Sequence, residues 1–134
     1  MDKIESVNYV LNDILTNIFE DITVEIDLFK YIKSTKLIKP EFNIKYLKSG
    51  VELDYNDELS GGEKDCISIA ITCAMAIIGY SKMIIFDESM RSLSPDKREK
   101  CIETISTYIK NKYVINVCHD TVEGCYDNVI SLTP

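Results

Sequence analysis

The sequence has few of the residues that interrupt secondary structure. It contains three prolines, five glycines and one histidine among 134 residues, of which 46% are hydrophobic and 28% charged. This composition argues against disorder and is typical of a globular protein with a packed core. The length suits one domain and is too short for two, so we predict a single domain over 1–134.

Positive charge is also scarce. The chain carries 15 Lys and Arg residues against 22 Asp and Glu residues, a formal net charge of −7. The domain as a whole therefore lacks the basic surface that is typical of nucleic-acid binding. If DNA is a partner, the contact must come from a local patch or from another subunit.

No apolar run is long enough to cross a membrane. The longest, residues 66–78, has 13 residues, whereas a bilayer requires ~20, and we interpret it as a buried helix. The first five residues do not resemble a signal peptide. We expect an intracellular protein, in the cytoplasm and nucleoid or in the nucleus, with no membrane partner.

The five cysteines form no C-x-x-C pair, and with one histidine they do not supply the usual ligand sets for zinc. Because their number is odd and several lie in apolar surroundings, we interpret them as reduced thiols of the core.

The first sixty residues combine a helix with strands. Apolar residues at helical spacing over 4–18 predict a helix of about five turns. Apolar and polar residues alternate over 22–28, 42–46 and 51–53, as in half-buried strands. We expect an antiparallel hairpin or meander with its turn at 36–40, followed by an acidic loop.

Helices and strands alternate after residue 60. Residues 63–80 predict a buried helix, and 83–86 a buried strand that ends at a ligand-facing edge. Ser94 and Pro95 are typical first residues of a helix, which should run to about residue 112. Two more strands are expected at 113–118 and 128–132, with a short helix or turn at 121–126 between them.

The segment Leu59-Ser60-Gly61-Gly62-Glu63-Lys64 precedes the first of these helices. Glycines let backbone N–H groups approach an anion, and a helix amino terminus adds partial positive charge. Ser60 can donate a hydroxyl and can also cap the helix. In isolation the triplet Ser-Gly-Gly is also typical of an ordinary turn into a helix.

Two adjacent carboxylates, Asp87 and Glu88, follow the strand at 83–86. Neighbouring residues on a strand point to opposite faces, so the two can do different jobs. One can hold Mg²⁺ through its water shell, and the other can orient or deprotonate an attacking water. An exposed acidic turn would give the same pattern.

The single histidine, His119, follows the expected strand at 113–118. If that strand is parallel to the one before Asp87, both residues lie at one edge of the sheet, where an imidazole could hydrogen-bond a phosphate or a water. A lone histidine at a strand end is also often a surface residue. We expect the Ser60 turn, the acidic strand tip and His119 to line a single surface at this edge.

These motifs, in this order, resemble the C-terminal lobe of an SMC-type ATPase head, closest in pattern to the SbcC-like branch of DNA double-strand-break repair. The resemblance covers essentially the whole chain. It implies the α/β fold of an ABC-type P-loop NTPase, with an N-terminal helix and antiparallel strands before alternating helices and buried strands. Its parts would be a coiled-coil root helix (1–20), a β region (21–58) and a signature, Walker B and switch-histidine region (59–134).

The resemblance also implies ATP and Mg²⁺ as cofactors and a role for each site residue. Asp87 would hold the metal, Glu88 would be the catalytic base, and His119 would sense the γ-phosphate. The signature motif, Leu59-Ser60-Gly61-Gly62-Glu63, would contact ATP held by the opposite head. Glu63-Lys64 favours the SMC and SbcC branch over transporters, which commonly carry Gln after the glycines.

The sequence departs from the family pattern in two places. The D-loop, which usually reads Leu-Asp, is here Leu93-Ser94. The phosphate-binding pattern G-x-x-x-x-G-K-[S/T] does not occur in these 134 residues, so ATP hydrolysis by the chain alone is not expected.

The leading hypothesis is therefore half of an ATPase. A P-loop-bearing N-terminal lobe, from the same gene or a separate chain, would complete the head, and two heads would dimerise around ATP. DNA and a nuclease subunit would be partners through the complex. Alternative hypotheses are a non-catalytic interaction or dimerisation module derived from such a head, and a transporter-associated cassette.

Overall fold

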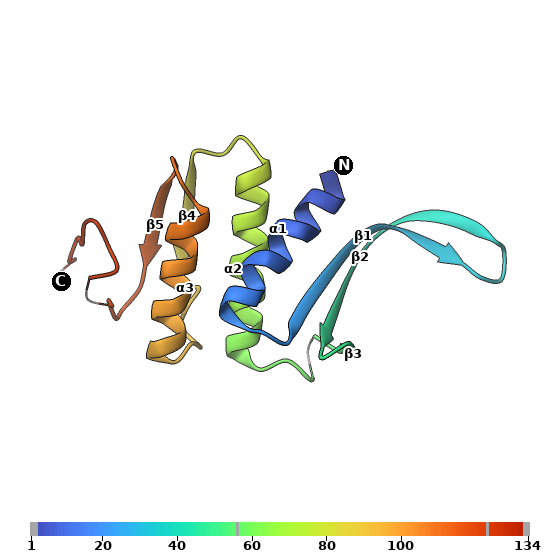
Figure 1. Cartoon of the computed structure of the whole chain (residues 1–134), viewed down its shortest axis with the longest axis horizontal. Coiled ribbons are helices and arrows are strands. Elements are labelled where there is room, and N and C mark those ends of the chain that lie inside the picture. Colours follow the sequence, from blue (N-terminus) through green and yellow to red (C-terminus); the bar gives the residue numbers. More distant parts are fainter. Residues whose placement is uncertain (1–2, 56, 123, 133–134) are drawn as a thin grey trace.

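A computed structural model describes residues 3–55, 57–122 and 124–132 (Figure 1). An antiparallel sheet lies at one end of the molecule, a parallel pair of strands at the other, and helices lie between them. This arrangement is the α/β fold that the sequence predicts; the first two residues of the expected coiled-coil root helix (1–20) lie outside the described residues. The elements are α1 (Lys3–Ile18), β1 (Ile22–Ile32), β2 (Leu37–Lys48), β3 (Val51–Leu53), α2 (Gly61–Ile78), β4 (Met83–Asp87), α3 (Pro95–Tyr108) and β5 (Tyr113–Val117).

Helix α1 has an apolar side in the core and a polar flank that closes the edge of β1. Asn12 donates from Nδ2 to the carbonyl oxygen of Val24 and accepts from the N–H of Val24 at Oδ1, both at 2.8 Å. Asn8 makes the same pair of bonds to Ile26, at 3.0 and 2.9 Å. The two amide side chains, one helical turn apart, take the place of a neighbouring strand and satisfy an otherwise open edge.

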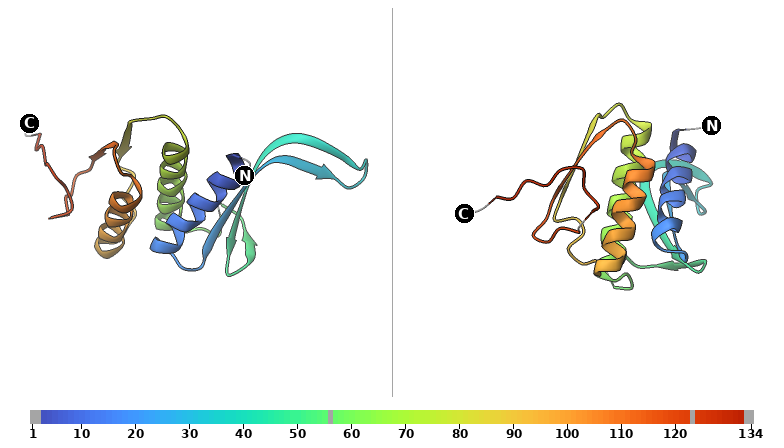
Figure 2. Two further views of the ribbon diagram at one scale, coloured as in Figure 1. Left: turned by 45° about the horizontal axis from the view of Figure 1, so that its top comes forward. Right: turned by 60° about the vertical axis from the view of Figure 1, so that its left-hand side comes forward.

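Strands β1 and β2 form a long antiparallel ribbon that extends away from the helices (Figure 2). Its base is anchored by the buried side chains of Ile22, Val24 and Ile26. The turn lies at 33–36, not at 36–40 as the sequence suggested. Pro40 is part of β2, opposite Phe29 and next to a register shift, where a residue without an N–H is tolerated.

Helix α2 is the centre of the molecule, between α1 and α3 (Figure 1). Its buried residues are mostly small or β-branched, which lets its neighbours approach closely: Cys66, Ile67, Ile69, Ala70, Cys73, Ala74 and Ala76. Burial raises the pKa of Cys73 to about 12. A hydrogen bond to Cys66 and burial likewise raise the pKa of Cys101. These thiols are therefore uncharged core groups, and all five cysteines are free.

Strands β4 and β5 pair in parallel, with Met83 opposite Tyr113 and Asp87 opposite Val117. Ile84 and Phe86 are buried on the helix side, whereas Ile85 and Ile115, on the other face, are 56% and 45% exposed. The prediction of a buried strand is therefore right for one face of β4 and wrong for β5. Within the described residues, no element packs against the outer face of this pair.

Two further expectations in the last third of the chain are wrong. Helix α3 ends at Tyr108 and not near residue 112. Residues 128–132 form no strand, and Ile130 and Leu132 are 86% and 91% exposed. A strand exists only through its ladder partner, and 128–132 has none in the part of the chain that the structure describes.

Across the residues described, every helix is too short or too polar to span a bilayer.

The four hydrogen bonds from Asn8 and Asn12 to β1, which we call the asparagine ladder, should contribute measurably to stability. Asn12→Ala removes one acceptor and one donor from the backbone of Val24, so we expect the free energy of unfolding to fall by about 2 kcal/mol. Thr16→Ala is the matched control, because Thr16 is exposed on the same helix and bonds only to the carbonyl of Asp13. Urea denaturation measures both; equal losses would contradict the proposed importance of the ladder.

Candidate functional site

The carboxyl ends of β4 and β5 and the amino ends of α2 and α3 lie at the same end of the molecule, at the bottom of Figure 1. This follows from the parallel pairing of the two strands, since each is reached from a helix that runs antiparallel to it. Carboxyl strand ends and amino helix ends are where α/β proteins bind anionic ligands.

Glu88 and His119 meet at this end. The N–H of Glu88 donates to the carbonyl of Val117 at 2.9 Å, so the ladder continues one residue past β4. Glu88 then turns the chain with a φ of +53°, a left-handed conformation that non-glycine residues seldom adopt. Its Oε1 lies 3.1 Å from Nε2 of His119, and the imidazole is 90% exposed. The imidazole and the carboxylate are therefore both available to a ligand.

Asp87 is placed differently from Glu88. It ends β4 on the open face of the sheet, following Met83 and Ile85. Glu88 instead lines a hollow of about 370 Å³ together with Met90, Arg91, Arg98, Cys118, His119 and Asp120. The two carboxylates thus face different surroundings, because Asp87 ends the strand and Glu88 lies in the turn after it.

Arg98 is a residue of this hollow that the sequence analysis missed. It lies in the first turn of α3, and its Nε is buried without a hydrogen-bond partner among the described residues. With Arg91 it brings positive charge to a hollow that also holds the carboxylate of Glu88. Its sequence signal, an arginine four residues after a Ser-Pro helix start, is too common to indicate a site.

The amino end of α2 is held by a capping box. Ser60, at the N-cap, accepts from the N–H of Glu63 at 3.3 Å, and Oε2 of Glu63 accepts from the N–H of Ser60 at 2.8 Å. This reciprocal pair satisfies two donors that a helix start leaves without partners. The other carboxylate oxygen, Oε1, lies 2.6 Å from Nζ of Lys48 in β2.

Glu63 is only 7% exposed, and it is charged. Burial alone would raise the pKa of this carboxyl, but the hydrogen bonds from Lys48 and Ser60 outweigh burial and hold the pKa below its usual value. Lys48 is the second residue that the sequence missed, because it lies in a different element and only the fold brings it near.

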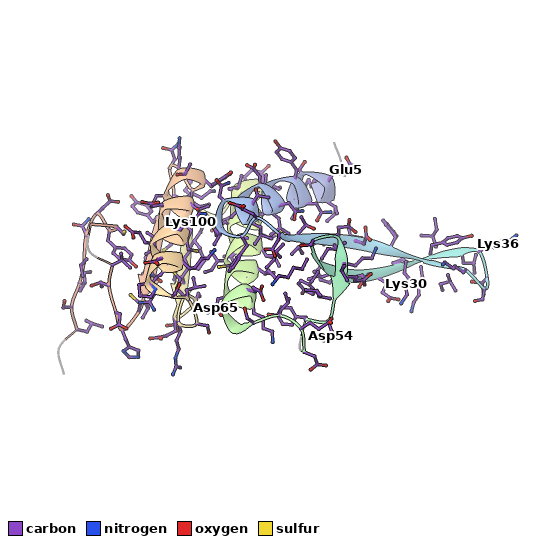
Figure 3. The ribbon with its side chains drawn as sticks, turned by 60° about the horizontal axis from the view of Figure 1, so that its bottom comes forward. Glu5, Lys30, Lys36, Asp54, Asp65 and Lys100 are labelled. Atoms are coloured by element: carbon purple, nitrogen blue, oxygen red, sulfur yellow. The ribbon has the colours of Figure 1, made fainter. Side chains whose placement is uncertain are left out.

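The loop 88–94 packs directly on the start of α2. A Cβ on Gly62 would lie 3.2 Å from the carbonyl oxygen of Ser92, so a larger residue would have to push this carbonyl back and glycine suits the close approach. Oδ2 of Asp65 accepts from the N–H of Ser92 at 2.9 Å; Figure 3 shows Asp65 at the amino end of α2. The D-loop pair lies in the same loop: Leu93 is buried, and Ser94 is the N-cap of α3 without a side-chain capping bond.

The expected site residues are thus at one end of the molecule but not in one pocket. Glu88 and His119 share a hollow, whereas Ser60, Gly61 and Gly62 do not line it. The loop 88–94 joins the two groups, since it begins at Glu88 and contacts Gly62 through Ser92.

Comparison with solved structures identifies the fold. An SMC ATPase from a study of "ATP-driven dimerization and DNA stimulated activation" superposes with a TM-score of 0.73 at 15% identity, over 98% of this chain and 78% of that one. A Pyrococcus furiosus Smc head domain with an extended coiled coil, bound to the C-terminal domain of ScpA, gives 0.67 at 17% identity, over 85% of this chain and 28% of that one. The chain has the fold of a lobe of an SMC-type ATPase head.

Curated proteins give a broader relationship. The chain is 36% identical over 133 residues to "ABC transporter A family member 7" of Dictyostelium discoideum, covering 92% of this chain and 15% of that protein. It is 25% identical over 138 residues to "Uncharacterized protein 050L" of Invertebrate iridescent virus 6, covering 96% and 13%. The chain thus spans less than a fifth of the length of these relatives. No family model matches it. These likenesses support an ABC-type ATPase head and do not single out the SbcC branch.

The capping box predicts a pH-dependent stability. Because the folded pKa of Glu63 is lowered, its contribution is complete above the unfolded pKa of about 4.3 and is lost as the pH falls through the lower folded value. Glu63→Ala should cost about 1–2 kcal/mol at pH 7 and less at pH 3. Urea denaturation at both pH values measures this.

The control for this prediction is Glu58→Ala, which removes an exposed carboxylate that accepts from the nearby N–H of Asp54 at 2.6 Å. A loss at Glu63 that is equal at pH 7 and pH 3 would contradict the role of the charged carboxylate.

Proposed function

We propose that the chain is the C-terminal lobe of an ATP-binding and hydrolysing SMC/SbcC-like head that acts in DNA repair, recombination or chromosome maintenance. In this proposal 1–20 is the coiled-coil root, 21–58 the β region, and 59–134 the part that handles nucleotide. The observation that carries it is a parallel sheet covered on one face only, with acidic and imidazole side chains at its carboxyl ends.

The sheet of β4 and β5, which is covered on one face only, supports the proposal that a partner lobe completes the head. Parallel sheets are stable when both faces are covered, and two strands alone do not make a stable sheet. The outer face of β4 and β5 instead exposes Met83, Ile85, Tyr113, Ile115 and Val117. A second lobe that packs on this face would bury these side chains.

The same lobe would supply the phosphate-binding loop that this sequence does not contain. The open ends of the sheet would then form a site from two chains or two parts of one chain. Head-to-head dimerisation would bring Ser60, Gly61 and Gly62 of one head to the nucleotide of the other, which fits their position outside the Glu88 hollow. DNA and a nuclease subunit would join through the assembled complex.

The residues present fit a magnesium nucleotide. Mg²⁺ prefers oxygen ligands and usually takes one or two protein carboxylates together with phosphate oxygens and waters. Among the described residues no group of three or more ligands could hold a metal by itself, which suits an ion that arrives with the nucleotide. Asp87 would hold it, and the bound ion would neutralise phosphate charge.

Glu88 and His119 would act on the reacting water and the terminal phosphate. Glu88 would accept a proton from, or orient, the water that attacks the γ-phosphate. His119, whose imidazole already contacts Glu88 at 3.1 Å, would hydrogen-bond the γ-phosphate. Their present contact keeps the two groups together at the sheet end.

ATPase activity should appear only when the lobes are combined. We expect no turnover from this chain alone, and turnover when it is mixed with a P-loop-bearing N-terminal lobe encoded in the same genome. Glu88→Gln should lower kcat in the mixture by about 10²–10⁴-fold, whereas Glu99→Gln, on exposed α3 surface, should leave kcat unchanged. Phosphate release measures both.

Turnover by the chain alone that Glu88→Gln abolishes would contradict the composite site. If the lobes associate but never hydrolyse ATP, the alternative of a non-catalytic dimerisation module is favoured; the Leu93-Ser94 D-loop is the sequence feature behind that alternative. The likeness to the Dictyostelium transporter keeps a transporter cassette as a second candidate, which association with a membrane subunit in place of an SMC-type lobe would favour.

The outer sheet face can be tested separately. Ile85→Asp places a charge on that face, and because Ile85 is 56% exposed the chain should lose less than about 1 kcal/mol of stability. Binding of the N-terminal lobe should weaken at least tenfold, since a buried unpaired charge is costly. Ile38→Asp is the control, at a 69% exposed strand residue far from this face. Calorimetric titration gives both affinities; equal weakening would overturn the interface.

A further inference from the structure

The β1–β2 ribbon carries a distribution of charge that the ATPase proposal does not use. We call residues 28–42 the arm; it contains four lysines and one acidic residue, a net charge of +3, so the remaining residues carry −10. The arm extends away from the body, with Lys30 and Lys36 along it (Figure 3). It is the local basic patch that an overall acidic DNA-binding protein would need.

The lysines lie on one face of the arm and at its tip. Lys30 and Lys39 are direct cross-strand partners, so they share a face, and Lys33 and Lys36 lie in the turn. Glu41 pairs with Lys30 at 3.0 Å and with Lys39 at 3.8 Å, while those lysines stay 59% and 63% exposed. Within the described residues, Lys33 and Lys36 form no ion pair. The tip therefore offers uncompensated positive charge to an anionic partner.

The opposite face of the arm is apolar and exposed. Phe29 pairs with Pro40 and Tyr31 with Ile38, so these residues alternate with the lysines. Phe29, Tyr31 and Ile38 are 60%, 58% and 69% exposed. The major groove of a DNA duplex is about 12 Å wide and admits a two-stranded β-ribbon. With the apolar face of the arm toward base edges such as the thymine methyl, the lysines of the turn and the long side chains of Lys30 and Lys39 on the outward face would extend to the phosphates that flank the groove.

We propose that the arm, through Lys30, Lys33, Lys36 and Lys39, is a docking site for the backbone and major groove of double-stranded DNA. This inference deepens the proposed function by naming the surface that contacts DNA. It is tested on the chain without nucleotide or partner lobe, so its failure leaves the ATPase experiment untouched, and the reverse also holds. A single strand fits less well, because stacking proteins hold it in a groove and the arm is a ribbon that protrudes from the body.

The test is binding of a fluorescein-labelled 20-base-pair duplex to the full chain, followed by anisotropy from about 50 to 200 mM salt. If four phosphates are neutralised, the slope of log K against log salt should be about −3.6, with a dissociation constant in the micromolar range at low salt. The double variant Lys33→Gln/Lys36→Gln should reduce the slope to about −1.8 and weaken binding at ~50 mM salt by at least about tenfold.

The matched control is Lys100→Gln/Lys110→Gln, which removes the same charge from exposed positions on the body. It should change affinity by less than about twofold, and circular dichroism checks that both variants fold. The proposal is overturned if the wild type does not bind the duplex, if the control loses as much affinity as the tip variant, or if a 20-nucleotide single strand or polyglutamate binds as tightly as the duplex.

Discussion

The burial of helix α2 is the constraint on which the rest of the structure depends. Its apolar residues face α1 on one side and α3 and β4 on the other, and only a narrow side with Ser68 and Met75 stays exposed. A helix with apolar residues around most of its circumference has to pack between neighbouring elements. The amino end of α2 is thereby held next to the carboxyl end of β4. Loop 88–94 packs against Gly61 and Gly62 at this end of the helix.

That packing links two chemically different places. The Glu88–His119 pair ends the parallel sheet, and the Ser60 cap begins the central helix; Ser92 contacts Gly62 and bonds to Asp65 between them. Loop 88–94 connects the two groups. If the acidic strand end moves relative to the start of α2, the contacts of Ser92 with Gly62 and Asp65 have to break; otherwise the two groups move together.

Much of the fold could be predicted from the sequence, for reasons that particular residues illustrate. Helical spacing placed α1, a long apolar run without a breaker placed α2, and alternation placed the base of β1, because these patterns reflect burial against a neighbour. The prediction of a strand at 128–132 failed because an apolar run indicates a need for cover but not whether a ladder partner is present. The arm turn was predicted at 36–40, but Pro40 lies within β2, where a register shift accommodates it.

Candidate site residues could be named from the sequence where a short segment contains them, as with Ser60 to Glu63 and Asp87-Glu88, and not where residues from separate elements converge. Lys48, Asp65 and Arg98 come from β2, α2 and α3, and nothing in their local sequence distinguishes them from ordinary surface charges.

The asparagine ladder of α1 has a consequence for assembly. Within the described residues β1 has its free edge occupied by Asn8 and Asn12, while β5 is paired on one side only. A strand of a second copy can add to a sheet only at an edge strand whose N–H and C=O groups are unpaired. Among the described residues the ladder therefore blocks strand addition at the base of the arm on the β1 side, whereas β3, β4 and β5 each keep an edge that a strand of another chain could join.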